Sequence, residues 1–201
     1  MTKNISEQIA AFAAQTAWAD IPADVRHEAK RSLLNYFATA IAGSNEIGMK
    51  KSLSVLAPFA ATGACKIIGR AEQVDMAFAA YLNGVSANIY DFDDTHQETV
   101  IHPTAPIAPA VFAHAEVRPC DGKALLKAFI IGGEIECRIG NAVSPSHYAR
   151  GWHITATCGV FGASAAIAGM LDLSEEQHVW ALGNAAAYTS GLVENLGTMS
   201  K

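Results

Sequence analysis

The richest concentration of chemically capable side chains lies between residues 91 and 103. The run DFDDTH covers residues 91–96, and His102 and Pro103 follow it closely. The stretch holds three carboxylates, a hydroxyl and two imidazoles. Like charges so close together cannot all ionise at little cost in a dry site, so we expect at least one carboxylate with a perturbed pKa or a cationic partner. The pattern is typical of acid–base sites, although a solvated helix end would carry the same residues without any function.

The same side chains also offer ligands for magnesium, manganese or zinc, with Asp91, Asp93 and Asp94 as the candidates. Paired aspartates in a helical chain are similar to the DDxxD motif of terpene synthases, but Gln97 stands where that motif requires its last acid. We therefore expect no resident metal. The sequence has no P-loop, HExxH, GxGxxG or GxSxG motif, which argues against the common kinase, metalloprotease, dinucleotide-binding and hydrolase sites.

A second constellation is the stretch HYARGWH at residues 147–153, which sets two imidazoles beside Arg150. A helix is expected to begin near Thr155, so Arg150 and the N–H groups of that helix could form an anion-binding corner next to His153. The alternative is an ordinary core histidine whose ring nitrogens are satisfied internally. The polar run at residues 194–201 carries no signal when it is taken alone.

Helical spacing of apolar residues, together with capping signals, predicts the elements that must position these groups. Residues 66–69 (KIIG) form only a short extended segment, and we find no convincing strand pair, repeat or linker. The sequence therefore predicts an all-α fold with a single helical domain over residues 1–201. The expected helices start at the capping box of Asn4 and Glu7, span residues 22–43 and 74–89, run from the prolines at 103–109 to about 117, span 122–143 after Asp121, and run from the capping box of Ser174 and Gln177 to 187.

Composition narrows the class of protein further. Hydrophobic residues make up 51% of the 201 positions and charged residues only 16%, so the chain is apolar enough to bury surface against a partner. The net charge of -5 would repel a nucleic-acid backbone, which excludes that partner class. The four cysteines are scattered without a CxxC pair, and this favours buried free thiols over disulfides or a zinc site.

One segment has the length of a membrane span. Residues 151–171 contain no Asp, Glu, Lys or Arg, but they are rich in Gly, Ala and Thr and lack aromatic belts, so we expect a buried central helix instead. The N-terminal run MTKNISEQ lacks the apolar core of a secretory signal, which makes a cytoplasmic location the expectation.

Taken together, five ordered stretches resemble the MmgE/PrpD family, which includes 2-methylcitrate dehydratases, cis-aconitate decarboxylases and iminodisuccinate epimerases. The resemblance extends over the whole chain. It implies a large helical domain, a homodimer and a reaction on a small polycarboxylate without an obligatory cofactor. The stretches are DFDDTH at 91–96, HP at 102–103, GGEIECRIGNAV at 132–143, RGWH at 150–153 and GLVENLGTMSK at 191–201.

The resemblance also implies which residues form the active site. The family positions fall on Asp91, Thr95, His102, His153 and Lys201. We hypothesise that His102 is the acid–base residue and that His153 and Lys201 bind or protonate the substrate. Asp91 and Thr95 would orient them by hydrogen bonds, and the neighbouring Arg150 would help to bind the substrate.

The implied activity is that of a lyase or isomerase acting next to a carboxylate, most similar to 2-methylcitrate dehydratase. An iminodisuccinate-type epimerase and a cis-aconitate-type decarboxylase are the alternatives, although residues 96–101 differ from the expected decarboxylase pattern. Family chains are more than twice as long and add a lid domain with a further active-site lysine. We therefore expect a fragment of an enzyme, with a truncated, non-catalytic helical dimerisation module as the other interpretation.

Overall fold

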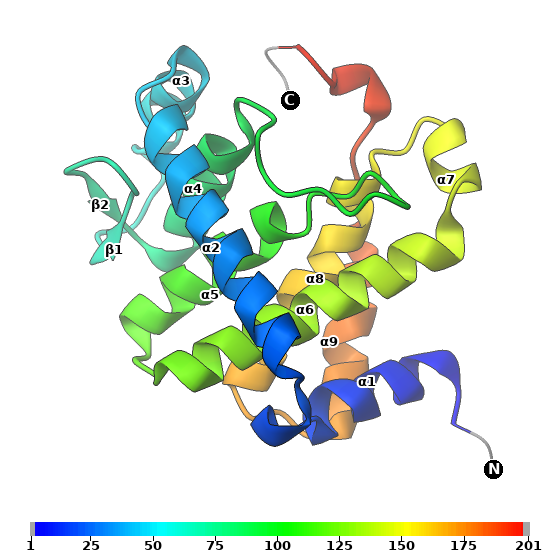
Figure 1. The fold of residues 1–201 in the computed structure, drawn as a ribbon. Coiled ribbons are helices and arrows are strands. Elements are labelled where there is room, and N and C mark those ends of the chain that lie inside the picture. The colour runs from blue at the N-terminus through cyan, green and yellow to red at the C-terminus, as the bar shows by residue number, and fades with distance from the viewer. Residues whose placement is uncertain (1–2, 199–201) are drawn as a thin grey trace.

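Helices form almost all of the regular structure, as the sequence predicts. The computed structural model of the protein describes residues 3–198 (Figure 1). Two 3-10 turns, Trp18–Asp20 and Val193–Asn195, accompany the main elements. In chain order these are α1 (Ile5–Gln15), α2 (Ala23–Gly43), α3 (Ile47–Leu56), β1 (Cys65–Lys66), β2 (Gln73–Val74), α4 (Met76–Asn88), α5 (Thr104–Val117), α6 (Gly122–Val143), α7 (Ser146–Ala149), α8 (Ile154–Met170) and α9 (Glu175–Ala187).

Side-chain caps explain why several helices begin where the sequence predicts. Both capping boxes are present, at Asn4 before α1 and at Ser174 before α9. The Asp121 side chain accepts a hydrogen bond from a backbone N–H in the first turn of α6, and Asp75 does the same for α4. Each cap satisfies helix N–H groups that would otherwise have no partner.

Four short elements were not predicted from the sequence. The expectation of no strand pair was wrong, because β1 and β2 form an antiparallel pair in which Cys65 faces Val74. Each strand has only two residues, too few for a period-two pattern. Helix α3 was missed because its N-cap, Glu46, makes no side-chain cap, and α7 is a single turn.

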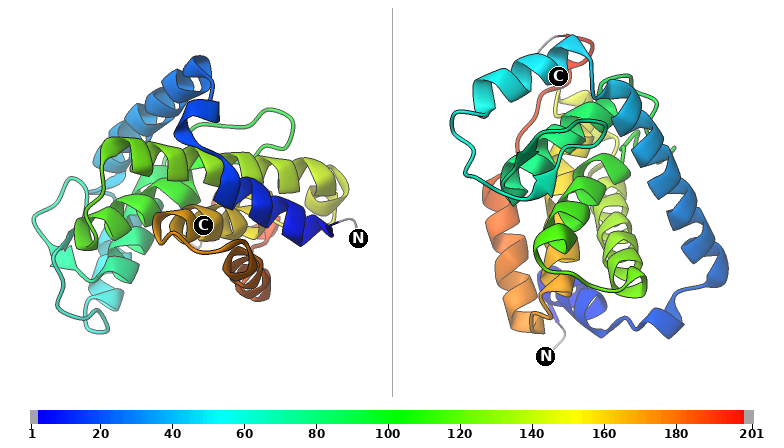
Figure 2. Two further views of the ribbon diagram at one scale, coloured as in Figure 1. Left: turned by 90° about the horizontal axis from the view of Figure 1, so that it is seen from below. Right: turned by 90° about the vertical axis from the view of Figure 1, so that its left-hand side faces the viewer.

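Helix α8 lies at the centre of the assembly and packs against α6, α5 and α9. Helices α2 and α4 pack on each other and on α5, which joins the two groups. Figure 2 shows α2 and α9 at opposite edges, with α5, α6 and α8 between them. The buried central helix predicted over residues 151–171 is thus confirmed as α8, and among residues 3–198 no helix is both long and apolar enough to cross a bilayer.

A close backbone contact brings α6 and α8 together. A Cβ built on Gly132 would lie 2.7 Å from the Gly162 carbonyl oxygen, and one built on Gly162 would lie 2.8 Å from the Gly132 carbonyl oxygen. Ile107 of α5 presses on the same point, with its side chain 2.9 Å from a Cβ on Gly162. Only glycine fits at both positions, so this crossing fixes how three helices converge.

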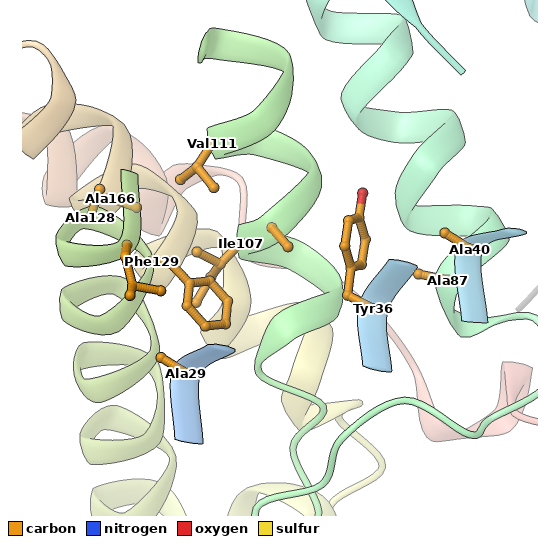
Figure 3. Close-up of a cluster of buried hydrophobic side chains, with 11 residues drawn as sticks. Ala29, Tyr36, Ala40, Ala87, Ile107, Val111, Ala128, Phe129 and Ala166 are labelled. Atoms are coloured by element: carbon orange, nitrogen blue, oxygen red, sulfur yellow. The ribbon is translucent and has the colours of Figure 1, made fainter. Parts of the chain in front are cut away.

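The main apolar cluster spreads outward from this crossing (Figure 3). Tyr36 of α2, Ile107 and Val111 of α5, and Phe129 of α6 belong to it, and the gaps are filled by alanines. The Tyr36 ring stacks on Phe112 with centroids 6.2 Å apart. The abundance of alanine in the sequence therefore reflects helices that lie close together.

All four cysteines are free thiols. This confirms the preference for thiols over disulfides, and Cys65 and Cys158 are buried as expected. Cys137 is only half-buried and Cys120 is exposed, so burial was predicted correctly for two of the four.

Replacing Gly162 with alanine tests the helix crossing. We expect Gly162→Ala to lower the free energy of unfolding by about 1–3 kcal/mol, because the added methyl group overpacks a rigid backbone contact. Gly169→Ala in the same helix is the matched control, since a Cβ there meets no atom within 4 Å. It should be neutral or stabilise by up to about 1 kcal/mol through helix propensity. Urea unfolding of both variants makes the comparison, and equal effects would contradict the packing argument.

Candidate active site

The acidic run leaves the end of α4 through a strained backbone position. Asp91 has φ 60°, in the left-handed region that aspartate tolerates better than most residues. The chain then continues through bends to His96, whose N–H donates to the Ile101 carbonyl at 2.8 Å. Val100 at the tip also has positive φ, at 55°, which is a rare conformation for a β-branched residue. We call residues 91–103 the aspartate loop, and its tight turn returns the chain to α5.

His102 is held from several directions. Its backbone N–H donates to Thr155 Oγ1 at 3.0 Å, which fixes it to the first turn of α8. The imidazole Nε2 lies 3.7 Å from Asp91 Oδ1, and Nδ1 lies 3.5 Å from Asp93 Oδ1. Thr95 Oγ1 is 3.4 Å from the same Nδ1. These contacts are longer than good hydrogen bonds, so the carboxylates orient the ring mainly through charge.

Asp93 lies beneath the imidazole and is only 5% exposed. Burial raises the pKa of its carboxyl group, while hydrogen bonding from Asn88 and the nearby His102 act in the opposite direction. The Asn88 amide donates to both oxygens, at 3.1 and 2.9 Å. The perturbed carboxylate expected in this cluster is therefore Asp93, and Asn88 is a site residue that the sequence analysis missed.

Asp94 has a structural role. Its carboxylate accepts from the Thr104 backbone N–H at 3.2 Å and from the Thr104 hydroxyl at 2.5 Å. Thr104 is the first residue of α5. Asp94 therefore caps the N-terminus of that helix, although it lies ten residues earlier in the chain. The bond holds the base of the aspartate loop against α5 and thereby fixes the backbone on either side of His102.

One group of side chains has the spacing of a metal site. Asp91, Asp93 and His102 each offer a ligand atom, and these atoms lie within 4.8 Å of one another. Two carboxylates and an imidazole would suit manganese or zinc. Asp94, which the sequence analysis grouped with them, instead holds Thr104.

His153 stands at the N-cap of α8, next to the C-terminal segment. Its N–H donates to the Gly191 carbonyl at 3.0 Å, and the Val193 N–H donates to the Gly151 carbonyl at 2.9 Å. Gly191 has φ 128°, and a Cβ there would lie 2.5 Å from the Ala156 side chain. Glycine is therefore required for the segment to lie across the start of α8, and residues 196–198 then line the cavity beside His153.

A cavity of about 1110 Å³ opens between these elements. Asn88, Asp91, His153 and Thr155 line its polar part. His102 lies behind Asp91, with a side chain 16% exposed, and is not itself a lining residue. Among the described residues the lining includes no lysine or arginine.

The other predicted site residues are spread around this cavity. Thr95 contacts His102, whereas Arg150 is exposed at the C-cap of α7 and does not line the cavity. Lys201 lies outside the described residues. His147, from the same stretch as Arg150, bonds Thr157 Oγ1 at 2.7 Å and stacks on Trp152, which makes it a structural histidine.

Glu136 is a buried acid behind the cavity wall. It is fully buried on α6, and neither carboxyl oxygen has a hydrogen-bond partner among the described residues. Burial first and the charge of Asp94 second raise its pKa well above the usual range. A Cβ on Gly159 would lie 3.3 Å from its Oε1, so a glycine leaves room for this carboxyl group. The sequence analysis missed Glu136, although helical periodicity places it one turn after the buried Gly132.

Glu136 makes the stability of the fold depend on pH. The folded state keeps this group protonated, whereas the unfolded chain ionises it above its ordinary pKa, so stability falls as pH rises. One proton per molecule changes the unfolding equilibrium constant about tenfold per pH unit. In Glu136→Gln we expect this slope to disappear from urea unfolding measured between about pH 5.5 and 8. Glu134→Gln, which removes a half-exposed acid from the same helix, should leave the slope intact, and identical slopes in all three proteins would refute the assignment.

Comparison with known proteins supplies an independent line of evidence. The model of the MmgE/PrpD N-terminal domain matches residues 7–201. A cis-aconitate decarboxylase of Aspergillus terreus is 31% identical over 195 residues, covering 94% of this chain and 40% of that protein. The cis-aconitate decarboxylase-like protein oryM of Aspergillus oryzae is 29% identical over 198 residues, covering 94% of this chain and 41% of that protein. A human cis-aconitate decarboxylase is 32% identical over 130 residues, covering 62% of this chain and 27% of that protein. The chain thus spans about two fifths of the length of the two fungal relatives.

Proposed function

Because the chain belongs to the MmgE/PrpD family, we propose that its cavity binds a small polycarboxylic acid and that the aspartate loop catalyses a lyase reaction beside one carboxylate. The single observation that carries this proposal is the placement of His102. Two aspartates flank its imidazole, and one of them, Asp91, lines a cavity large enough for such an acid. Thr155 accepts from the backbone N–H of His102, and Thr95 lies 3.4 Å from its ring nitrogen.

Decarboxylation is the reaction that the relatives favour, since they are named as cis-aconitate decarboxylases. In such a step the bond to the leaving carboxyl carbon breaks, carbon dioxide departs, and the electron pair remains on the substrate. A proton must then reach that carbon. In this step His102 donates the proton, and Asp91 and Asp93 keep its ring in position.

The rest of the substrate needs cationic or N–H groups, because it carries further carboxylates. His153 and Thr155 line the cavity at the start of α8, and the N-terminus of a helix favours a bound anion. Lys201 follows three residues after Thr198, which lines the same cavity. We assign Lys201 and His153 to the binding of substrate carboxylates.

Replacing His102 tests its role. We expect His102→Ala to lower kcat by about 10²–10⁴-fold, the usual contribution of a positioned acid or base. His27→Ala, an exposed histidine on α2, is the control and should keep full activity. Turnover is measured with cis-aconitate, 2-methylcitrate, citrate and iminodisuccinate. Loss of water from 2-methylcitrate or epimerisation of iminodisuccinate would identify the related reactions of the family. A folded protein that turns over none of these acids would support the non-catalytic module.

Dialysis against a chelator separates acid–base chemistry from metal catalysis at Asp91, Asp93 and His102. We expect unchanged turnover after exhaustive treatment with EDTA, because the proposed step needs only a proton from His102. Activity that is lost and then returns with added manganese or zinc would overturn this expectation and make these three residues a metal centre.

A further inference from the structure

Helix α3 and the hairpin of β1 and β2 stand apart from the aspartate loop in sequence. Figure 1 shows both on the side of the molecule opposite α7. Helix α3 nevertheless begins at the cavity, because Glu46 at its N-cap and Ile47 in its first turn line it. A carboxylate from outside the aspartate loop is therefore part of the cavity wall.

Glu46 bonds the residue that comes immediately before Asp91. Its Oε1 accepts a hydrogen bond from the Tyr90 hydroxyl at 2.5 Å, and both side chains line the cavity. The carboxylate raises the pKa of the Tyr90 phenol, first through this hydrogen bond, so the phenol keeps its proton and remains the donor. A hydrogen bond to a charged acceptor is stronger than one between neutral groups. The bond therefore fastens the end of α4 to the start of α3.

Glu46 is itself held by the turn that precedes α3. Its backbone N–H donates to the Gly43 carbonyl at 3.1 Å. Arg70, from the turn between β1 and β2, donates to the Ser44 carbonyl at 3.1 Å. A Cβ built on Gly43 would lie 2.1 Å from the Ser86 carbonyl oxygen, so α2 and α4 meet there in backbone contact. The acceptor of the phenol is thus supported by α2, α4 and the hairpin.

The placement of Tyr90 matters because of the residue that follows it. Asp91 has φ 60°, and its Oδ1 lies 3.7 Å from His102 Nε2. A left-handed φ is unfavourable for a residue with a Cβ and persists where surrounding contacts hold it. The Asp91 side chain is 58% exposed, so burial does little to fix it, whereas Asp93 is buried and bonded by Asn88.

From these contacts we infer that Glu46 and Tyr90 are positioning residues for the candidate active site. Their hydrogen bond holds the backbone that enters Asp91 and thereby keeps the Asp91 carboxylate beside the His102 imidazole. The effect on catalysis rests on the proposed function, whereas the effect on Asp91 can be measured without turnover. The inference gives α3 and the hairpin of β1 and β2 a part in the site.

Hydrogen exchange tests the structural part of the inference without any substrate. The Asp91 N–H donates to the Asn88 carbonyl at 3.1 Å, and we expect Tyr90→Phe to speed its exchange by about tenfold or more, because the turn opens more often. Amides in α8 should keep their exchange rates. Tyr188→Phe is the matched control, since this tyrosine is 77% exposed at the end of α9, and it should leave Asp91 unchanged. Unchanged exchange at Asp91 in Tyr90→Phe, or equally faster exchange throughout α8, would overturn the inference.

Steady-state kinetics with the acid that the parent protein turns over test the catalytic part. We expect Tyr90→Phe to lower kcat by about tenfold or more and to change KM by less than about twofold, because a small misplacement of a reacting group costs rate. A higher KM at unchanged kcat would make Tyr90 a substrate contact and overturn its positioning role. Glu46→Gln keeps an acceptor oxygen and should retain more of kcat than Glu46→Ala.

Combining the substitutions tests whether the two residues act through one bond. The double variant of Tyr90→Phe and Glu46→Ala should have a kcat no lower than that of the slower single variant, since either change alone removes the bond. Losses that multiply would contradict a shared role.

The measurements also separate this inference from the proposed function. A parent protein that turns over none of the acids would reject the proposed function, and faster exchange at Asp91 in Tyr90→Phe would still support the inference. An active parent protein whose Tyr90→Phe variant keeps both kcat and the exchange rate at Asp91 would reject the inference alone.

Discussion

The contact between the backbones of α6 and α8 at Gly132 and Gly162 is the constraint on which the rest of the molecule depends. It permits these helices to approach more closely than side chains with a Cβ would allow, and Ile107 of α5 closes against the same point. The position of α8 then sets where its first turn lies, and with it Thr155 and His153. The chemistry at one end of α8 is thus positioned by packing in its middle.

Polar contacts transmit that placement to the aspartate loop. Thr155 holds the backbone of His102, Asp94 holds Thr104, and Asn88 holds Asp93. Each contact links a different helix to the loop, which has a strained turn of its own at Val100. The strain is sustained because three helices fix the ends of the loop. An imidazole between two carboxylates is therefore held in a fixed position.

The sequence was sufficient to predict the helices whose ends carry a chemical signal, such as the caps at Asn4, Asp121 and Ser174. It located the acidic cluster but did not predict which aspartates would lie beside His102 and which would bond another residue. Whether Asp94 faces His102 or Thr104 depends on how the chain turns between them, and no periodicity encodes that turn. Glu136 escaped because its burial is set by the distant Gly159 and Gly162. The hairpin of β1 and β2 escaped because two-residue strands have no pattern.

The proposed function requires that a polycarboxylate binds with its carboxylates at His153 and the first turn of α8 while His102 faces the reacting carbon. A crystal structure of the protein with propane-1,2,3-tricarboxylate, which lacks a reactive double bond or hydroxyl, tests this most directly. We predict one carboxylate within hydrogen-bond distance of the His153 imidazole and a carbon of the ligand facing His102. A ligand bound away from both histidines, with the cavity between α4 and α8 left open, would contradict the account.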